Sequence, residues 1–531
     1  MRKAWLFMLM LVFAALLVVG CSGGGTEPSS STTQEEPKGE TSSSSSQQEG
    51  AIDEDATVII GIADQVVTLD PANYRSRITE SVIRNIFDGL VTRTPDGKVV
   101  PMIAESWENP TPTEWIFTIR EGVTFHDGSE LTVEDVIFTF ERTITEGAID
   151  GNTSPRKGLI EPLVAVEKVD DRRVKFILSE PWPILITMLP HHQIVPKAYV
   201  EKVGDAEFAK NPIGAGPFKL KEAKLDERIV LERYDNYWGG KPKIKTRVFD
   251  IIPENNSRIA ALQSGSVHRI QGVSPELIPQ LEASGDIEVK TANGTRVYMV
   301  EMNTQKPPFN DVRVRQAMNY AVDMEKIVEL ILGGYGKALK GPILEESFGI
   351  NKNLPGYEYN PEKAKQLLAE AGYPDGFSVV IDTKDTTNQV ALAVASQLRE
   401  IGIDAQIRVW EWGVLQPLIQ KGERMMYLTD WGNSTQDPYD FLNPKLRTND
   451  RGNYSFYSNP RVDELLNAAS IETDVQKREQ MYREAQEIIF EEAPWIFGYS
   501  MMEIEAGVKK LKNWQPASDG MLNMHEVYME K

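Results

Sequence analysis

Residues 377–410 read FSVVIDTKDTTNQVALAVASQLREIGIDAQIRVW, and the class of fold can be argued from them. An apolar, β-branched run at 377–381 is typical of a strand. A helical pattern at 389–401 ends before Gly402, and a second strand follows at 404–410. A strand, a helix and a strand at this spacing predict two parallel strands joined by a right-handed crossover. The sequence therefore indicates an α/β fold.

The alternation of strands and helices continues on both sides of this unit. Residues 57–62 predict a buried strand, and residues 114–119 alternate with the period of a strand. Capping residues mark several helix starts, because their side chains accept from the first free backbone N–H groups. Strands are also expected at 228–233, 246–252 and 297–302, and helices at 81–90, 133–143 after Thr132, 255–264, 361–371 after Asn360, 460–469 and 475–491 after Asp474.

The N-terminus carries an export signal. Arg2 and Lys3 precede an uncharged, mostly apolar run at residues 4–19, which is short for a membrane span. Val18-Val19-Gly20-Cys21 resembles the lipobox of bacterial lipoproteins, and that resemblance implies cleavage after residue 20 and lipidation of Cys21. The alternatives are a plain signal peptide or an uncleaved anchor. We expect the protein on the cell membrane, lipid-anchored on its extracytoplasmic face.

Residues 21–56 are expected to form a disordered tether between the lipid and the folded part. They are rich in Ser, Glu, Gln and Gly and contain no aromatic residue, so they cannot bury enough surface to offset chain entropy. The remaining chain is long enough for two or three domains. With one cysteine in 531 residues, no internal disulfide can form.

The composition also limits the partners. The net charge is −21, which argues against nucleic acid because its phosphates would be repelled. The sequence contains no phosphate-binding loop, zinc-protease motif or nucleophile elbow. We expect no cofactor, no metal and no catalytic residue, and a monomer. His191-His192 is interpreted as a loop or surface pair, and the roles of His268 and Arg269 stay open.

Several blocks together resemble the bacterial extracellular solute-binding proteins of family 5, the oligopeptide- and dipeptide-binding group. The first is Ala104-Glu105-Ser106-Trp107-Glu108, and the next is Gly122-Val123-Thr124-Phe125-His126-Asp127-Gly128. Similar blocks occur in the same order at residues 131–142, 211–218, 237–242, 302–323, 359–372, 401–403 and 431–442. The resemblance covers nearly the whole chain after residue 57.

The resemblance implies an α/β fold of the periplasmic-binding-protein type II, with two lobes and an extra domain inserted in lobe I. Lobe I is expected to comprise residues 57–90, 212–302 and 501–531, with the extra domain at 91–211 and lobe II at 303–500. We place the crossing between the lobes at Pro307-Pro308.

The resemblance further implies a function: a receptor that captures solute, peptides above all, by closing its lobes and delivers it to the permease of an ABC transporter. Oligosaccharide, glutathione or metal-chelate binding are alternatives within the same fold. An exported cell-envelope hydrolase is the alternative of another class; it requires a nucleophile with a base, or paired carboxylates, in the cleft.

The candidate binding residues centre on a loop after a strand, where α/β sheets bind ligands. They are Trp431, Asn433, Ser434, Thr435 and Asp437. Trp431 is either a cleft residue that stacks on a planar or sugar-like group or a core tryptophan. In peptide-binding relatives an aspartate a few residues before the Asp-Pro pair holds the ligand ammonium. That place falls on Ser434 here, and Asp437 could substitute or act as a cap.

Further candidates are Trp412, one of two tryptophans beside Glu411, and Gln65 and Val66, which are expected to line the cleft from lobe I.

Overall fold

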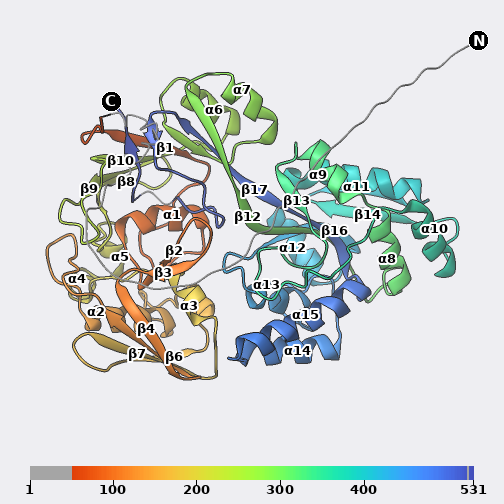
Figure 1. Ribbon diagram of the computed structural model, residues 1–531, viewed down its shortest axis with the longest axis horizontal. Coiled ribbons are helices and arrows are strands. Elements are labelled where there is room, and N and C mark those ends of the chain that lie inside the picture. The colour runs from red at the N-terminus through yellow and green to blue at the C-terminus, as the bar shows by residue number, and fades with distance from the viewer. Residues whose placement is uncertain (1–50, 523–524) are drawn as a thin grey trace, which may run out of the picture. The chain divides into compact units, whose positions relative to one another are not determined.

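The computed structural model describes residues 51–522 and 525–531 (Figure 1). The export signal, Cys21 and most of the tether lie outside the described residues. Residues 52–56 of the expected tether belong to the folded part: Ile52 forms a β-bridge with Glu530, and Ala56 is buried. None of the helices in the described ranges has the length and apolar character needed to cross a membrane.

The predicted strand–helix–strand unit is confirmed. It comprises β14 (Ser378–Thr383), α11 (Asn388–Glu400) and β15 (Asp404–Val409), and the two strands pair in parallel. Helix α11 buries one face, formed by Val390, Ala391, Val394, Ala395 and Leu398. The i, i+4 spacing of these residues is that of an amphipathic helix packed on a sheet.

One large sheet passes through both lobes. Its strand order is β15-β14-β16-β12-β17-β11-β1-β10-β9-β8, with β13 also paired to β17. The end at β15-β14-β16 belongs to lobe II, and the end at β11-β1-β10-β9-β8 belongs to lobe I. The bounds are β1 (Thr57–Ile62), β8 (Phe218–Lys224), β9 (Arg228–Arg233), β10 (Thr246–Ile251), β11 (Arg269–Gln271), β12 (Ile287–Met302), β13 (Gly336–Ala338), β16 (Met426–Gly432) and β17 (Trp495–Val508).

Two long strands join the lobes. β12 and β17 are antiparallel neighbours and run side by side between the lobes in Figure 1. The N-terminal part of β12 pairs with β17 only, whereas residues 296–302 also pair with β16. We placed the crossing at Pro307-Pro308, but these residues come after the end of β12. The chain already crosses between the lobes along β12 itself.

Lobe I carries a separate four-stranded sheet, in the order β4-β5-β7-β6. Helix α2 (Val133–Ile144) packs on it and begins in a capping box of Thr132 and Asp135. This region has its own apolar core, which includes Phe117, Phe140 and Phe176. Its elements are β4 (Ala104–Thr111), β5 (Glu114–Ile119), β6 (Leu163–Lys168), β7 (Arg173–Leu178), α3 (Leu185–Met188), α4 (Lys197–Val203) and α5 (Asp205–Phe208), beside the hairpin of β2 (Val91–Arg93) and β3 (Val99–Pro101).

The other helices cover the large sheet. Lobe I has α1 (Arg77–Ile86), α6 (Asn255–Gln263) and α7 (Ile278–Glu282), and its last strands are β18 (Leu511–Lys512) and β19 (Tyr528–Met529). Lobe II has α8 (Val312–Tyr320), α9 (Met324–Ile331), α10 (Pro361–Glu370), α12 (Trp412–Gln420), α13 (Pro438–Leu446), α14 (Pro460–Ile471) and α15 (Val475–Glu492).

Helix α1 begins four residues before the expected start at 81 and ends four residues earlier. Ser76 caps it, because the Ser76 side chain accepts from the Thr79 N–H. Gly89, inside the expected helix range, forms a β-bridge with Gln193. The earlier start brings Arg77 and Glu80 into the first turn of α1.

His268 and Arg269 have structural contacts. The His268 Nδ1 accepts from the Ile59 N–H at 3.0 Å. The Arg269 guanidinium donates to Glu505 at 2.6 Å and lies over the Trp514 ring, and both members of this ion pair are buried. These contacts hold β11 between β1 and β17.

Candidate functional site

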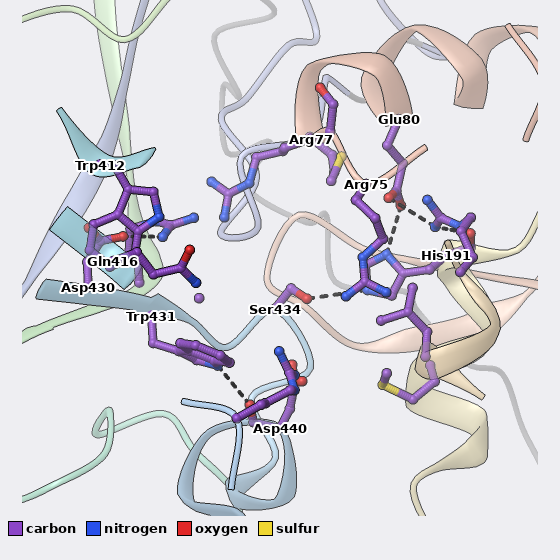
Figure 2. A pocket seen from close by; sticks show the side chains of 18 of the residues that line it. Arg75, Arg77, Glu80, His191, Trp412, Gln416, Asp430, Trp431, Ser434 and Asp440 are labelled. Atoms are coloured by element: carbon purple, nitrogen blue, oxygen red, sulfur yellow. Dashed lines mark hydrogen bonds and ion pairs between the residues drawn. The ribbon is translucent and has the colours of Figure 1, made fainter. Parts of the chain in front are cut away.

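A cavity of about 740 Å³ lies between the lobes. Lobe I contributes residues before and within α1 and residues of the inserted region, including Arg75, Glu80 and His191. Lobe II contributes residues of α12, of β16 and of the loop that follows β16. Figure 2 shows the lobe II side chains Trp412 and Trp431 facing the lobe I residues across this space.

The lobes touch directly beside the cavity. The Arg93 guanidinium, from β2, donates to the Ser434 backbone carbonyl at 2.8 Å. Trp182 and Tyr439 pack edge to face, with ring centroids 6.2 Å apart. The chain is therefore in an arrangement in which lobe I and lobe II close on the cavity.

Three of the candidate binding residues line the cavity: Trp412, Trp431 and Ser434. Trp412 is the first residue of α12, and Trp431 lies near the end of β16. The Trp431 indole N–H donates to the backbone carbonyl of Asp440 at 3.2 Å, which fixes the ring plane. Of the two alternatives for Trp431, the structure places it at the cleft and not wholly within the core.

The other three candidates of this loop are buried behind the cavity. The Asp437 side chain caps α13 by accepting from the Tyr439 N–H, and its two oxygens accept from Arg478 at 2.7 Å each. The Thr435 hydroxyl donates to Asn433 Oδ1 and accepts from the Asp437 N–H. These contacts build the turn that presents Ser434, and they occupy Asp437 fully.

Gln65 and Val66 do not line the cavity. Val66 is buried in the core of lobe I, and its backbone N–H donates to Leu225. Gln65 is exposed outside the cavity. The expectation that this segment forms the lobe I wall is wrong, because the hydrogen bond to Leu225 holds it against the lobe I core.

The interpretation of His191-His192 as a surface pair is also wrong: their side chains are 8% and 3% exposed. His191 contacts one residue from each lobe. Its Nδ1 lies 2.8 Å from Glu80 Oε1, and its Nε2 lies 3.3 Å from the Ser434 hydroxyl (Figure 2). This serine–histidine–glutamate order is also the order of a nucleophile, a base and an orienting acid.

The electrostatics of these contacts keep His191 neutral. Burial is the largest effect and lowers the pKa of His191, and Arg93 and Arg84 act in the same direction, against Glu80. Burial opposes ionisation of Glu80, but the hydrogen bond from His191 and the charges of Arg84 and Arg156 together hold its pKa well below the ordinary value. With Glu80 ionised and His191 neutral, Nδ1–H donates to Glu80, and Nε2 accepts from the Ser434 hydroxyl.

A second group of charges lies on the lobe II side. Asp430 on β16 forms ion pairs with both Arg296 and Lys384. Burial opposes ionisation of Asp430, but these two cations outweigh it and lower the pKa of Asp430. Asp440 differs, because burial raises its pKa to about 6 in spite of the nearby Arg451.

No local sequence signal identified the lobe I wall. Arg75 and Glu80 belong to one segment, but His191 lies 111 residues after Glu80, and neither segment carries a motif. Glu80 lies one residue before the predicted helix at 81–90, and its burial depends on Arg156 and His191 from the inserted region.

A cavity closed by two α/β lobes, which are joined by two crossing strands of one sheet, defines a two-lobed solute-binding protein of the type II periplasmic class. The model of the bacterial extracellular solute-binding proteins, family 5 (middle region), matches residues 98–453. The chain belongs to this family.

Relatives share most of their length with this chain. Heme-binding protein A of Haemophilus influenzae is 31% identical, over 75% of this chain and 78% of its own. The dipeptide-binding protein of Escherichia coli is 31% identical, over 82% and 86%. The periplasmic binding protein DppA of Helicobacter pylori, solved with the peptide STSA, has a TM-score of 0.76 and 30% identity, and covers 90% of this chain and 98% of that one.

Proposed function

We propose that this protein is the receptor of an ABC importer and captures small peptides or peptide-like solutes between its two lobes. The observation that carries the proposal is the cavity of about 740 Å³ with side chains from both lobes in its wall. Its size lies within the range of roughly 300–1,000 Å³ of small-molecule sites, which suits short peptides. The relatives' names include a dipeptide and the peptide STSA, which support this class of solute, and heme, which belongs to another class.

The solute acts through contacts with both lobes. A ligand shifts an equilibrium between open and closed forms only by its differential affinity for the two. A solute in this cavity touches Trp412 and Trp431 of lobe II and the α1 segment of lobe I at once only when the lobes are together. The permease can then distinguish the loaded form by its closed surface.

The same fold accommodates other solutes. Trp412 and Trp431 could also stack on sugar rings, which keeps oligosaccharides as an alternative, together with glutathione and metal chelates. Ser434 carries no charge at the place where peptide-binding relatives hold the ligand ammonium, so recognition of a free amino end needs another group.

The test combines binding with closure. Calorimetry with dipeptides, tripeptides, glutathione and oligosaccharides identifies the solute, and small-angle scattering measures compaction on binding. At a ligand concentration of 100 Kd, the free energy of unfolding rises by about 2.7 kcal/mol. Trp431→Ala should lose affinity, while Trp107→Ala, outside the cavity, should not. If no solute from any class binds, the receptor proposal fails.

We also propose that Cys21 carries a lipid and that the mature protein is a monomer on the outer face of the cell membrane. The basic, apolar and small-residue order of the leader, with the single cysteine at its end, supports the lipid anchor. Labelled palmitate should be incorporated into the wild type and not into Cys21→Ser, and the variant should leave the membrane fraction. Retention of label by Cys21→Ser contradicts the proposal.

One observation favours the hydrolase alternative: the Ser434–His191–Glu80 chain inside the cavity. Two facts favour the receptor. Glu80 also forms ion pairs with Arg84 and Arg156, which reduces its support for a protonated His191. Burial and nearby arginines disfavour the imidazolium that such a reaction forms. Incubation with peptides and ester substrates decides: cleavage products that disappear in Ser434→Ala would establish the hydrolase.

A further inference from the structure

The cavity wall is cationic although the chain is acidic. The chain has a net charge of −21, yet the wall combines six cationic side chains with three carboxylates. The cations are Arg75, Arg77, Arg156, Arg296, Lys384 and Arg451, and the carboxylates are Glu80, Asp430 and Asp440. A positive pocket in an acidic protein indicates a ligand of negative charge.

Four of the six cations have anionic partners within the protein. Arg156 pairs with Glu80, and Arg77 pairs with Glu503 at 3.0 Å. Arg296 and Lys384 share the single charge of Asp430. Their positive charge is therefore largely, though not fully, compensated before any solute arrives.

The remaining two, Arg75 and Arg451, form no ion pair with any of the described residues. The Arg75 guanidinium donates to the Pro155 backbone carbonyl at 3.0 Å. The side chains of Arg75 and Arg451 are both exposed to solvent. The Arg451 guanidinium lies over the Trp431 ring, 4.9 Å from its centroid. Partial desolvation by the cavity wall lowers the pKa of Arg75, and repulsion from Arg156 and Arg451 adds to the effect. Two guanidinium groups from opposite lobes thus line the same cavity and repel each other, and neither forms an ion pair with a described residue.

We propose that the solute bears a carboxylate in addition to any terminal one, and that this additional carboxylate binds between Arg75 of lobe I and Arg451 of lobe II. The natural ligands are then acidic peptides or peptide-like polycarboxylates. This rests on the proposed receptor function. Guanidinium groups suit carboxylates because their planar donors bind two oxygens at once. A carboxylate in this place bridges the lobes and removes the repulsion that otherwise opposes their closure.

The neighbouring groups select against a cationic solute end. Ser434 faces His191, which is neutral. Burial raises the pKa of Asp440, another carboxyl of the wall, whereas the charges of Arg451, Arg93 and Arg75 lower it. An ammonium beside Asp440 would therefore meet several arginines.

The test uses peptides that differ only in charge: Ala-Glu, Ala-Gln and Ala-Lys, with glutarate as a non-peptide dicarboxylate. Calorimetry on the lipid-free mature protein should give Ala-Glu the lowest Kd and Ala-Lys the highest. Arg75→Gln and Arg451→Gln should each weaken Ala-Glu about fivefold or more, because partly exposed charge pairs contribute modestly. They should leave Ala-Gln unchanged, which also verifies folding.

Arg461→Gln is the matched control. Arg461 is on α14, pairs with Glu464 and Glu484, and does not line the cavity. The proposal is overturned if Ala-Gln or Ala-Lys binds as tightly as Ala-Glu, or if neither arginine variant changes the Kd of Ala-Glu. Neutral peptides that bind and compact the protein without charge preference defeat this inference alone. If no peptide and no dicarboxylate binds, the receptor function fails with it.

Discussion

Lys445 and Glu301 form an ion pair without solvent access directly behind the cavity. Lys445 Nζ lies 2.6 Å from Glu301 Oε1, and both side chains are 0% exposed. The Thr429 hydroxyl donates to the same carboxylate. The ammonium also lies 4.6 Å from the Tyr454 ring centroid and 5.6 Å from that of Trp431, so it supports the aromatic wall of the site. The pair joins α13 to the crossing strand β12.

We expect Lys445→Met to lower the free energy of unfolding by about 3–5 kcal/mol, because it leaves the Glu301 carboxylate buried without a counter-ion. Glu301→Gln should cost a similar amount, because it strands the ammonium. Burial already lowers the pKa of Lys445, with Glu301 opposing the effect, so the ammonium depends on this partner. The double variant removes both charges and should cost less than either single change.

Urea unfolding of the four proteins, followed by tryptophan fluorescence, measures this cycle. The dependence of the unfolding free energy on urea should stay constant, which shows that the unfolded reference is the same. Arg461→Gln, which breaks exposed ion pairs on α14, should change the free energy by at most about 1 kcal/mol. The reasoning is refuted if Lys445→Met lies within 1 kcal/mol of the wild type, or if the single costs add in the double variant.

Three further outcomes are expected. Because the pKa of Asp440 is raised to about 6, its negative charge is lost as the pH falls through that value. The affinity for Ala-Glu, measured by titration calorimetry, should therefore rise severalfold from pH 7.5 to 5.5. In Asp440→Asn this rise should be much smaller. Asp437→Asn should cost about 3 kcal/mol in urea unfolding, since it strands the buried Arg478, whereas Ser434→Ala should cost less than about 1 kcal/mol; equal costs would contradict the structural role of Asp437. Gly498→Ala should destabilise by about 1–3 kcal/mol by thermal or urea unfolding, because a Cβ there would lie 2.1 Å from a backbone carbonyl of β12; a neutral effect would show that the crossing strands are not packed this closely.

The elements that local patterns determine were predicted well. The strand–helix–strand unit, β1 and β5 match their expected ranges within one or two residues, because burial period and turn residues agree there. Asp474 and Asn360 cap their helices as expected, since both act through backbone groups three residues away. Helix α1 was misplaced, because Ser76 provides a stronger start than the pattern near residue 81.

The candidate site was likewise predicted only where its residues are close together in sequence. Its lobe II wall lies in one loop and one helix start, so Trp412, Trp431 and Ser434 could be found from sequence. Its lobe I wall combines the α1 segment with the inserted region, and only the folded chain brings Glu80 to His191. Asp437 looked like a ligand group because its partner Arg478 is far from it in sequence.

The hinge and the binding wall share residues. The pairing of β12 with β17 shifts register between Asn293 and Val297 and again between Tyr298 and Val300, and such irregularities let strands bend locally. Arg296, which holds Asp430, lies within the first irregular segment, and Val297 pairs with Trp431 on β16. A bend at this point of β12 therefore moves the cationic and aromatic wall of lobe II relative to Arg75 of lobe I. In the proposed binding mode, a solute held between Arg75 and Arg451 therefore acts on the two crossing strands where their pairing is irregular.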